Sequence, residues 1–129
     1  MKFSRLSLLV VVVLAAALAA CGGGGGGSAA QPTSGKTYDV AATEFAFNPN
    51  TFSGTVGEKI TFKINNKGTV DHTFVILNAD GSQELAKATI KVGSSETLEF
   101  TPTAAGDYKI DCDLPGHKEA GMTGTLTVK

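Results

Sequence analysis

The sequence predicts an all-β protein, a Greek-key β-sandwich or barrel of seven to eight strands. Apolar and polar residues alternate in several segments of residues 37–129, as they do in strands with one buried and one solvated face. Short clusters of Gly, Asn, Asp and Pro separate these segments, for example NNKG at 65–68 and ADGS at 79–82. Many short strands within 93 residues are typical of a sandwich or barrel around one core.

The individual strands follow from this alternation. In KITFKIN, residues 59–65, Ile and Phe alternate with Thr, Lys and Asn. The same rhythm predicts strands in VDHTFVIL (70–77), TLEF (97–100), DYKIDC (107–112) and TGTLTVK (123–129). Residues 82–88, SQELAKA, are expected to form a helical turn. Tyr108 resembles the tyrosine corner of Greek-key sandwiches, although a plain core tyrosine fits the pattern equally well.

The first 20 residues predict a signal peptide. Lys2 and Arg5 supply a positively charged start, and residues 6–20 are almost all Leu, Val and Ala. This apolar run is shorter than the roughly 20 residues that a membrane-spanning helix needs. It ends in small residues, which is typical of a secretory signal. A retained membrane-anchor helix is the alternative.

The end of this segment, Leu18-Ala19-Ala20-Cys21, resembles the lipobox of bacterial lipoproteins. The resemblance implies cleavage before Cys21 and a lipid on its sulfur, so residues 1–20 are expected to be a lipoprotein signal peptide. The glycine-rich stretch that follows is a flexible linker by composition, which makes residues 21–36 a tether. We therefore expect an exported protein, lipid-anchored to the outer face of the cell membrane or in the periplasm.

The net charge of the chain is unfavourable for binding nucleic acid. Without Lys2 and Arg5 the chain keeps nine basic and twelve acidic residues, a net charge of −3. Domains that bind nucleic acid typically carry a basic patch or stripe, and this sequence has no basic run. No nucleic-acid partner is expected.

Three rare residue types share one short stretch, CDLPGHKEAGM, residues 112–122. The chain has two cysteines, two histidines and two methionines, and this stretch holds one of each: Cys112, His117 and Met122. Alternation places the cysteine on the buried face of its strand, and the turn residues Pro115, Gly116 and Gly121 bend the chain just before the other two. A thiolate, an imidazole and a thioether are therefore expected to converge on one point.

A fourth ligand must come from elsewhere, and His72 is the remaining histidine. Alternation places His72 on the same face as Phe74 and Ile76, toward the core. Two imidazoles, one thiolate and a long axial thioether describe a type 1 blue copper site. Zinc prefers four firm ligands, and iron–sulfur clusters need several cysteines.

Other interpretations of these residues stay open at this level. Cys112 is compatible with a buried inert thiol or with a disulfide to Cys21, and His72 with an ordinary core histidine. A nucleophilic Cys–His pair would make the protein an enzyme, but it would leave Met122 without a role. A metal-free adhesion or structural sandwich is a further possibility.

The stretch YKIDCDLPGHKEAGMTGTLTV, residues 108–128, resembles the copper-binding loop of the cupredoxins, the type 1 blue copper family. Its Cys-x4-His-x4-Met spacing is most similar to that of the auracyanins, membrane-tethered relatives of plastocyanin and azurin. Residues 44–76 resemble the N-terminal half of the same family. The resemblance implies a cupredoxin-like copper-binding domain over residues 37–129, with one copper ion bound by four ligands: His72, Cys112, His117 and Met122.

Three residues depart from or add to the pattern of this family. Thr73 follows His72 where many relatives have Asn, and Asp113 follows Cys112 where Ser or Thr is frequent. Asp111 lies on the other side of the cysteine. Unscreened carboxylates this close to the sulfur favour Cu(II) over Cu(I). The resemblance therefore predicts the ligand geometry but not the redox potential.

A closed set of four protein ligands leaves no open position for a substrate, so we expect an electron carrier, not an enzyme, and no small-molecule substrate. The resemblance implies that the edge of His117 lies exposed in an apolar patch where transient redox protein partners dock. Four residues would supply this patch: Leu114, Pro115, Ala120 and Gly121. The expected function is a membrane-tethered shuttle of single electrons between envelope redox partners through Cu(I) and Cu(II). The alternative is an exported copper chaperone or buffer without an electron-transfer role.

Overall fold

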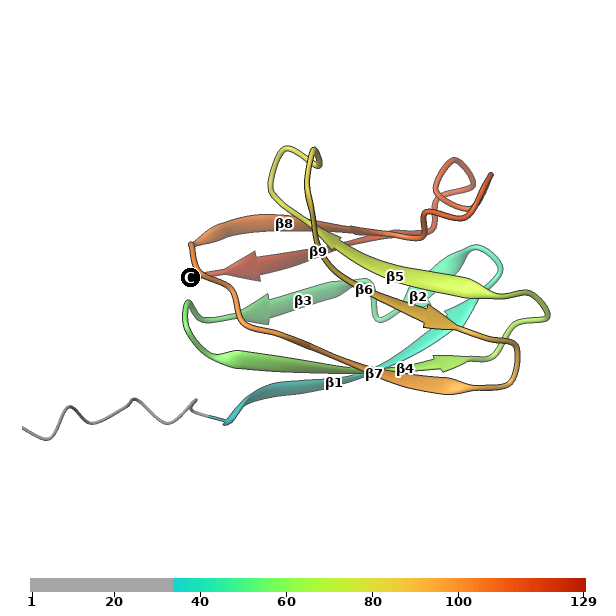
Figure 1. The fold of residues 1–129 in the computed structure, drawn as a ribbon, viewed down its shortest axis with the longest axis horizontal. Helices are drawn as coiled ribbons and strands as arrows, with labels where there is room; N and C mark the ends of the chain where they lie inside the picture. The colour runs from blue at the N-terminus through green and yellow to red at the C-terminus, as the bar shows by residue number, and fades with distance from the viewer. Residues whose placement is uncertain (1–33) are drawn as a thin grey trace, which may run out of the picture.

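The computed structural model describes residues 34–129, which form nine β-strands in two facing sheets (Figure 1). One sheet has the strand order β2-β1-β4-β7 and consists of β1 (Ser34–Thr43), β2 (Ala46–Asn48), β4 (Lys59–Asn66) and β7 (Ser95–Phe100). The other has the order β3-β9-β8-β5-β6 and consists of β3 (Thr51–Gly54), β5 (His72–Leu77), β6 (Glu84–Ile90), β8 (Gly106–Asp111) and β9 (Thr123–Val128).

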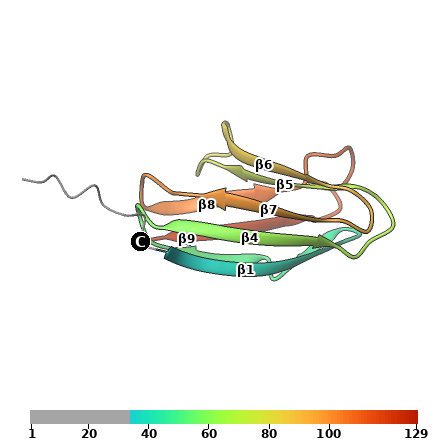
Figure 2. The same cartoon turned by 60° about the horizontal axis from the view of Figure 1, so that its bottom comes forward.

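The chain crosses repeatedly from one sheet to the other, as Figure 2 shows from a second direction. β1 runs parallel to β4 and β3 runs parallel to β9, whereas the other strand pairs are antiparallel. These features confirm the all-β prediction and agree with a Greek-key sandwich. The described residues contain nine strands because the turn at Pro49 separates two very short ones, β2 and β3.

The expected helical turn at residues 82–88 is wrong. Residues from Glu84 onward form β6, in which Lys87 is paired with Val75 and Ala88 with Phe74. Local helix propensity is a weak preference, and backbone pairing with the buried strand β5 overrides it.

The core between the sheets is rich in aromatic side chains. Phe62 of β4 and Phe74 of β5 come from opposite sheets, are fully buried, and have ring centroids 5.1 Å apart. Phe52 of β3 meets Phe62 edge-on at 5.2 Å. Burying one such side chain contributes about 1.5–3 kcal/mol. The cluster therefore anchors β5, the strand that begins with His72.

Tyr108 forms a tyrosine corner at the start of β8. Its hydroxyl donates to the carbonyl of Ala104 at 2.8 Å and accepts the Ala104 N–H at 3.3 Å. This contact ties the loop before β8 to the strand. The other end of the same strand leads directly to Cys112.

The predicted signal peptide (1–20), Cys21 and the linker as far as residue 33 lie outside the described residues. The first strand begins at Ser34, slightly before the predicted domain start at 37. The start of β1 and the C-terminus lie at one end of the sandwich, opposite the loop of residues 112–122 (Figure 1). From residue 34 to residue 129, no helix has the length and apolar character needed to cross a membrane.

Candidate metal centre

Cys112 lies at the point where β8 ends and the ligand loop, residues 112–122, begins. It follows Tyr108 and Ile110 on the core-facing side of the strand, and its side chain is completely buried. Its N–H donates to the carbonyl of Met122 at 3.1 Å, which closes the base of the loop. Among residues 34–129 it is a free cysteine, so its sulfur is available to a metal.

Backbone hydrogen bonds give the ligand loop its shape. The N–H of His117 donates to Leu114 O at 3.1 Å, and the N–H of Met122 donates to His117 O at 3.0 Å. Gly116 and Gly121 have φ angles of +84° and +100°, a region that L side chains rarely adopt. The two glycines thus allow the tight turns that bring the loop's three donor residues close together.

His72 reaches the centre from the other part of the chain, as the first residue of β5. The turn before it is held from inside by Asn66, whose side chain donates to Val70 O at 2.8 Å and Ile90 O at 3.1 Å. From outside, the carboxylate of Glu44 accepts hydrogen bonds from the N–H and the hydroxyl of Thr69. These hydrogen bonds hold the Thr69 N–H against the carboxylate and lower the pKa of Glu44 from 4.5 to about 2.

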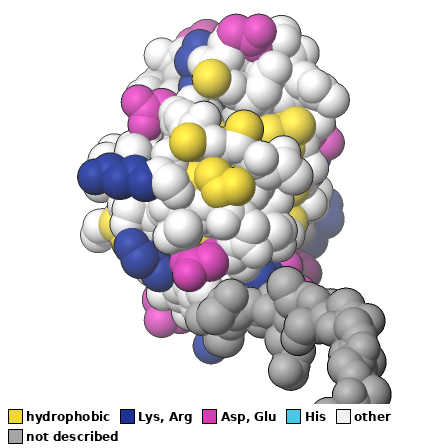
Figure 3. Space-filling model, turned by 90° about the vertical axis from the view of Figure 1, so that its left-hand side faces the viewer, with side chains coloured by type: hydrophobic (Ala, Val, Ile, Leu, Met, Phe, Trp, Pro, Cys, Tyr) yellow, Lys and Arg dark blue, Asp and Glu magenta, His cyan; other side chains and the backbone are white. Residues whose placement is uncertain are grey.

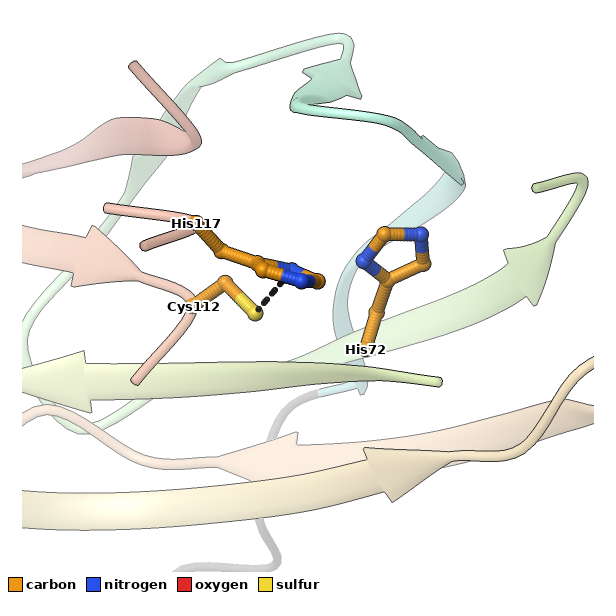
Figure 4. A group of neighbouring side chains, drawn as sticks. All are labelled: His72, Cys112 and His117. Carbon is orange, nitrogen blue, oxygen red and sulfur yellow. Dashed lines mark hydrogen bonds between the residues drawn. The ribbon is translucent and has the colours of Figure 1, made fainter. Parts of the chain in front are cut away.

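The fold brings the two histidines and the cysteine together (Figure 4). The donor atoms of His72, Cys112 and His117 all lie within 4.8 Å of one another. The sulfur is 3.4 Å from His117 Nδ1, and the centroids of the two imidazole rings are 5.2 Å apart. Met122 is fully buried at the base of the same loop, and its backbone is hydrogen-bonded to both Cys112 and His117.

These residues fit a bound copper ion. Both ring nitrogens of His72 are buried without a hydrogen-bond partner, although buried polar atoms are normally paired. Burial, with a smaller contribution from the nearby His117, lowers the pKa of His72 and favours the neutral imidazole that binds metals. An orphaned imidazole facing a second imidazole and a thiol is the donor set of type 1 copper. The four residues therefore form a candidate type 1 copper site.

Comparison with known proteins decides the family. Residues 7–128 match the family model of the cupredoxin-like domain. The chain is a cupredoxin. Plastocyanin A/B of Petroselinum crispum is 37% identical over 87 residues, which cover 64% of this chain and 86% of that protein. The copper-resistant cuproprotein CopI of Rubrivivax gelatinosus is 29% identical over 105 residues, covering 70% and 64% of the respective chains.

A solved structure supports the same assignment. The sodium-dithionite-reduced auracyanin of Roseiflexus castenholzii superposes with a TM-score of 0.66 at 27% identity. The match covers 74% of this chain and 98% of the auracyanin. The likeness to cupredoxins and auracyanins that the ligand loop predicts is thus confirmed.

The carboxylates beside the ligands of this cupredoxin are each paired with a lysine. The pairs are Asp71–Lys91, Asp111–Lys118 and Asp113–Lys87. The hydrogen bond from Lys87 lowers the pKa of Asp113, and the hydrogen bond from Lys91 lowers that of Asp71. The negative charge that the sequence places around the sulfur is therefore compensated locally.

The sequence interpretation did not include several residues that shape the site. Phe45 packs edge-on against the ring of His117, with centroids 5.0 Å apart and an interplanar angle of 78°. Asn66, Glu44 and Lys87 also went unrecognised. Their partners are 4 to 26 residues away in the chain, and local alternation carries no signal for such contacts.

Proposed function

We propose that this cupredoxin is a membrane-tethered electron carrier that passes single electrons between redox partners of the cell envelope. The observation that carries the proposal is the convergence of His72, Cys112 and His117 within 4.8 Å, two of them fully buried. A bound copper ion would supply a one-electron Cu(I)/Cu(II) couple. The proposal includes neither an enzymatic reaction nor a small-molecule substrate, because four protein donors leave no vacant position.

The protein's contribution is to hold the donors in one arrangement for both oxidation states. His72 is fixed by a core strand, and the ligand loop is closed by hydrogen bonds from Cys112 to Met122 and from Met122 to His117. Side chains positioned in this way need little movement when the charge at the centre changes by one unit. A small rearrangement favours rapid electron exchange.

His117 offers the route by which electrons enter and leave. It is partly exposed, and the residues of the predicted apolar patch belong to the same loop: Pro115, Ala120 and Gly121 are exposed and Leu114 is half-buried. Phe45, 42% exposed and in contact with the His117 ring, extends this patch. We propose that redox proteins dock here transiently, through the small interfaces typical of electron-transfer encounters.

A lipid on Cys21 would attach this carrier to a membrane by the end remote from the copper site. The start of β1 lies at the end of the sandwich opposite the ligand loop (Figure 1). Figure 3 views that end, where acidic and basic side chains are intermingled around small apolar areas. A tether leaving from this end would allow the apolar patch around His117 to face away from the membrane, toward its partners.

Copper titration tests the proposal. Stoichiometric Cu(II) should produce an intense blue thiolate-to-copper band that ascorbate bleaches and an oxidant restores. Cys112→Ser should abolish the band, while Cys21→Ser should keep it and lose membrane attachment. If the blue band survives in Cys112→Ser, the ligand assignment is wrong.

A copper chaperone or buffer is the second candidate, because the chain also resembles a copper-resistant cuproprotein. A buffer that holds only Cu(I) would stay colourless with Cu(II). Electron self-exchange between the blue and the reduced protein separates the two functions. Rapid exchange supports the carrier, whereas a blue protein with very slow exchange supports copper storage.

A further inference from the structure

The hydroxyl of Thr73 lies between two acceptors beside the copper site. Thr73 Oγ1 is 3.4 Å from Cys112 Sγ and 2.7 Å from Asp113 Oδ1. The N–H of Asp113 donates to the same hydroxyl oxygen at 3.0 Å. The backbone N–H of Thr73 also points at the sulfur, with N to Sγ at 3.4 Å. Thr73, which follows His72 in β5, therefore connects that strand with Asp113, the residue after Cys112.

A hydroxyl has one proton, so it can donate to only one of these acceptors. A carboxylate oxygen at 2.7 Å is a short, charge-assisted acceptor, whereas sulfur at 3.4 Å makes a weaker contact. The Asp113 N–H already occupies a lone pair of the hydroxyl oxygen, which orients the remaining proton. The carboxylate of Asp113 therefore takes the proton, and the sulfur does not.

Lys87 holds this carboxylate in place. Its ammonium group pairs with Asp113 Oδ2, the oxygen that does not face Thr73. The two side chains are 35% and 41% exposed, and ion pairs this accessible contribute little to stability. The pair instead presents the other oxygen of Asp113 to Thr73.

We propose that Asp113, oriented by Lys87, is a positioning residue that withholds the Thr73 hydroxyl proton from the Cys112 thiolate. Thr73 then donates to the sulfur through its backbone N–H and not through its hydroxyl. Hydrogen bonds to a copper-bound thiolate weaken its electron donation and tune the redox potential. With the hydroxyl engaged elsewhere, the thiolate donates more strongly, and the potential is held lower than it would be with a second hydrogen bond to the sulfur.

A double-mutant cycle on the copper-loaded protein tests this inference, which rests on the copper site proposed above. Thr73→Val removes the hydroxyl in three backgrounds: wild type, Asp113→Ala and Asp111→Asn. Asp111→Asn is the matched control, because it removes a carboxylate on the other side of Cys112 and leaves the Thr73–Asp113 contact intact. The readouts are the midpoint potential and the energy of the thiolate-to-copper band.

Thr73→Val should change the potential little in the wild type and in Asp111→Asn. In Asp113→Ala the freed hydroxyl should donate to the sulfur, so the potential should rise further than in Asp111→Asn, and Thr73→Val should then lower it. Equal shifts from Thr73→Val in all three backgrounds would overturn the inference. Equally large decreases would mean that the hydroxyl already bonds the sulfur, and equally small ones that it does not bond the sulfur even without Asp113. A wild type without any blue band would instead contradict the copper site itself.

Proton NMR of the unmodified, metal-free protein gives an independent readout should Asp113→Ala fail to fold. The Thr73 hydroxyl proton should exchange slowly and show Overhauser contacts to the β-hydrogens of Asp113. Contacts to the β-hydrogens of Cys112 in their place would overturn the inference without reference to any bound metal.

Discussion

The candidate copper ligands come from two regions, the start of β5 and the ligand loop, and these regions are held in place differently. His72 opens a core strand, is completely buried, and follows a turn held by Asn66 and Glu44. Cys112, His117 and Met122 share an eleven-residue loop that is shaped by its own backbone hydrogen bonds and by two glycines. The His72 side depends on contacts between distant parts of the chain, whereas the loop side depends on neighbours.

This difference predicts which mutations should affect the stability of the fold and which should affect mainly copper binding. Changes in the sandwich core should unfold the protein and disturb His72, while changes in the loop should weaken copper binding with a smaller loss of stability. The following variants test that separation, from the largest expected effect to the smallest.

Phe62→Ala should have the largest effect, because it leaves a cavity beside Phe74, two residues from His72. Large-to-small changes of this kind cost about 3–5 kcal/mol. Chemical denaturation of the metal-free protein measures the loss. Leu114→Ala in the ligand loop is the matched comparison and should cost clearly less, since Leu114 is only partly buried. Equal losses would show that the loop and the core are not energetically distinct.

Asn66→Ala should destabilise the protein by about 1–3 kcal/mol, because it leaves the buried carbonyl of Ile90 and the part-buried carbonyl of Val70 without this donor. Copper affinity should fall as well, since the same side chain shapes the turn before His72. Asn65→Ala is the control, because the side-chain oxygen of Asn65 accepts a surface hydrogen bond from the Ser95 hydroxyl. If both variants unfold at the same denaturant concentration, the turn is not held by Asn66.

Gly121→Ala should cost about 1–2 kcal/mol, because its φ of +100° is unfavourable for a residue with a Cβ. Gly57, at φ +80° in the turn after β3, is a matched control with equally open surroundings. Both variants should lose similar stability in the metal-free state, but only Gly121→Ala should weaken copper binding. A similar loss of affinity in Gly57→Ala would argue against a separate contribution from the loop.

Glu44→Gln should have the smallest effect, and the effect should depend on pH. The pKa of Glu44 is lowered from 4.5 to about 2 by the hydrogen bonds from Thr69. A carboxylate with a lowered pKa stabilises the folded state above the unfolded-state pKa, and this contribution disappears as the pH falls toward 2. Unfolding of the metal-free protein should therefore distinguish Glu44→Gln from wild type at pH 7 and not near pH 2. A difference that persists at pH 2 would contradict this origin.

Much of the fold and the site was predictable because the relevant signals are periodic or rare. Alternation in residues 59–65 and 123–129 predicts strands that the structure contains. The wrong prediction of a helical turn at 82–88 shows the limit of local patterns, since pairing with β5 decides the structure of that segment. The lysine partners of Asp113 and Asp111 were not predictable, because no local pattern relates side chains on different strands and loops.

The sequence by itself determined the class of fold and the chemistry of the donors, since both follow from which residues stand at which spacing. Only the tertiary structure decided that His72 meets Cys112, that Phe45 packs against the ring of His117, and that the Thr73 hydroxyl lies between Asp113 and the cysteine sulfur. Those outcomes depend on how two sheets pack and on which of two acceptors lies nearer. Such contacts between distant segments arise only once the chain is folded.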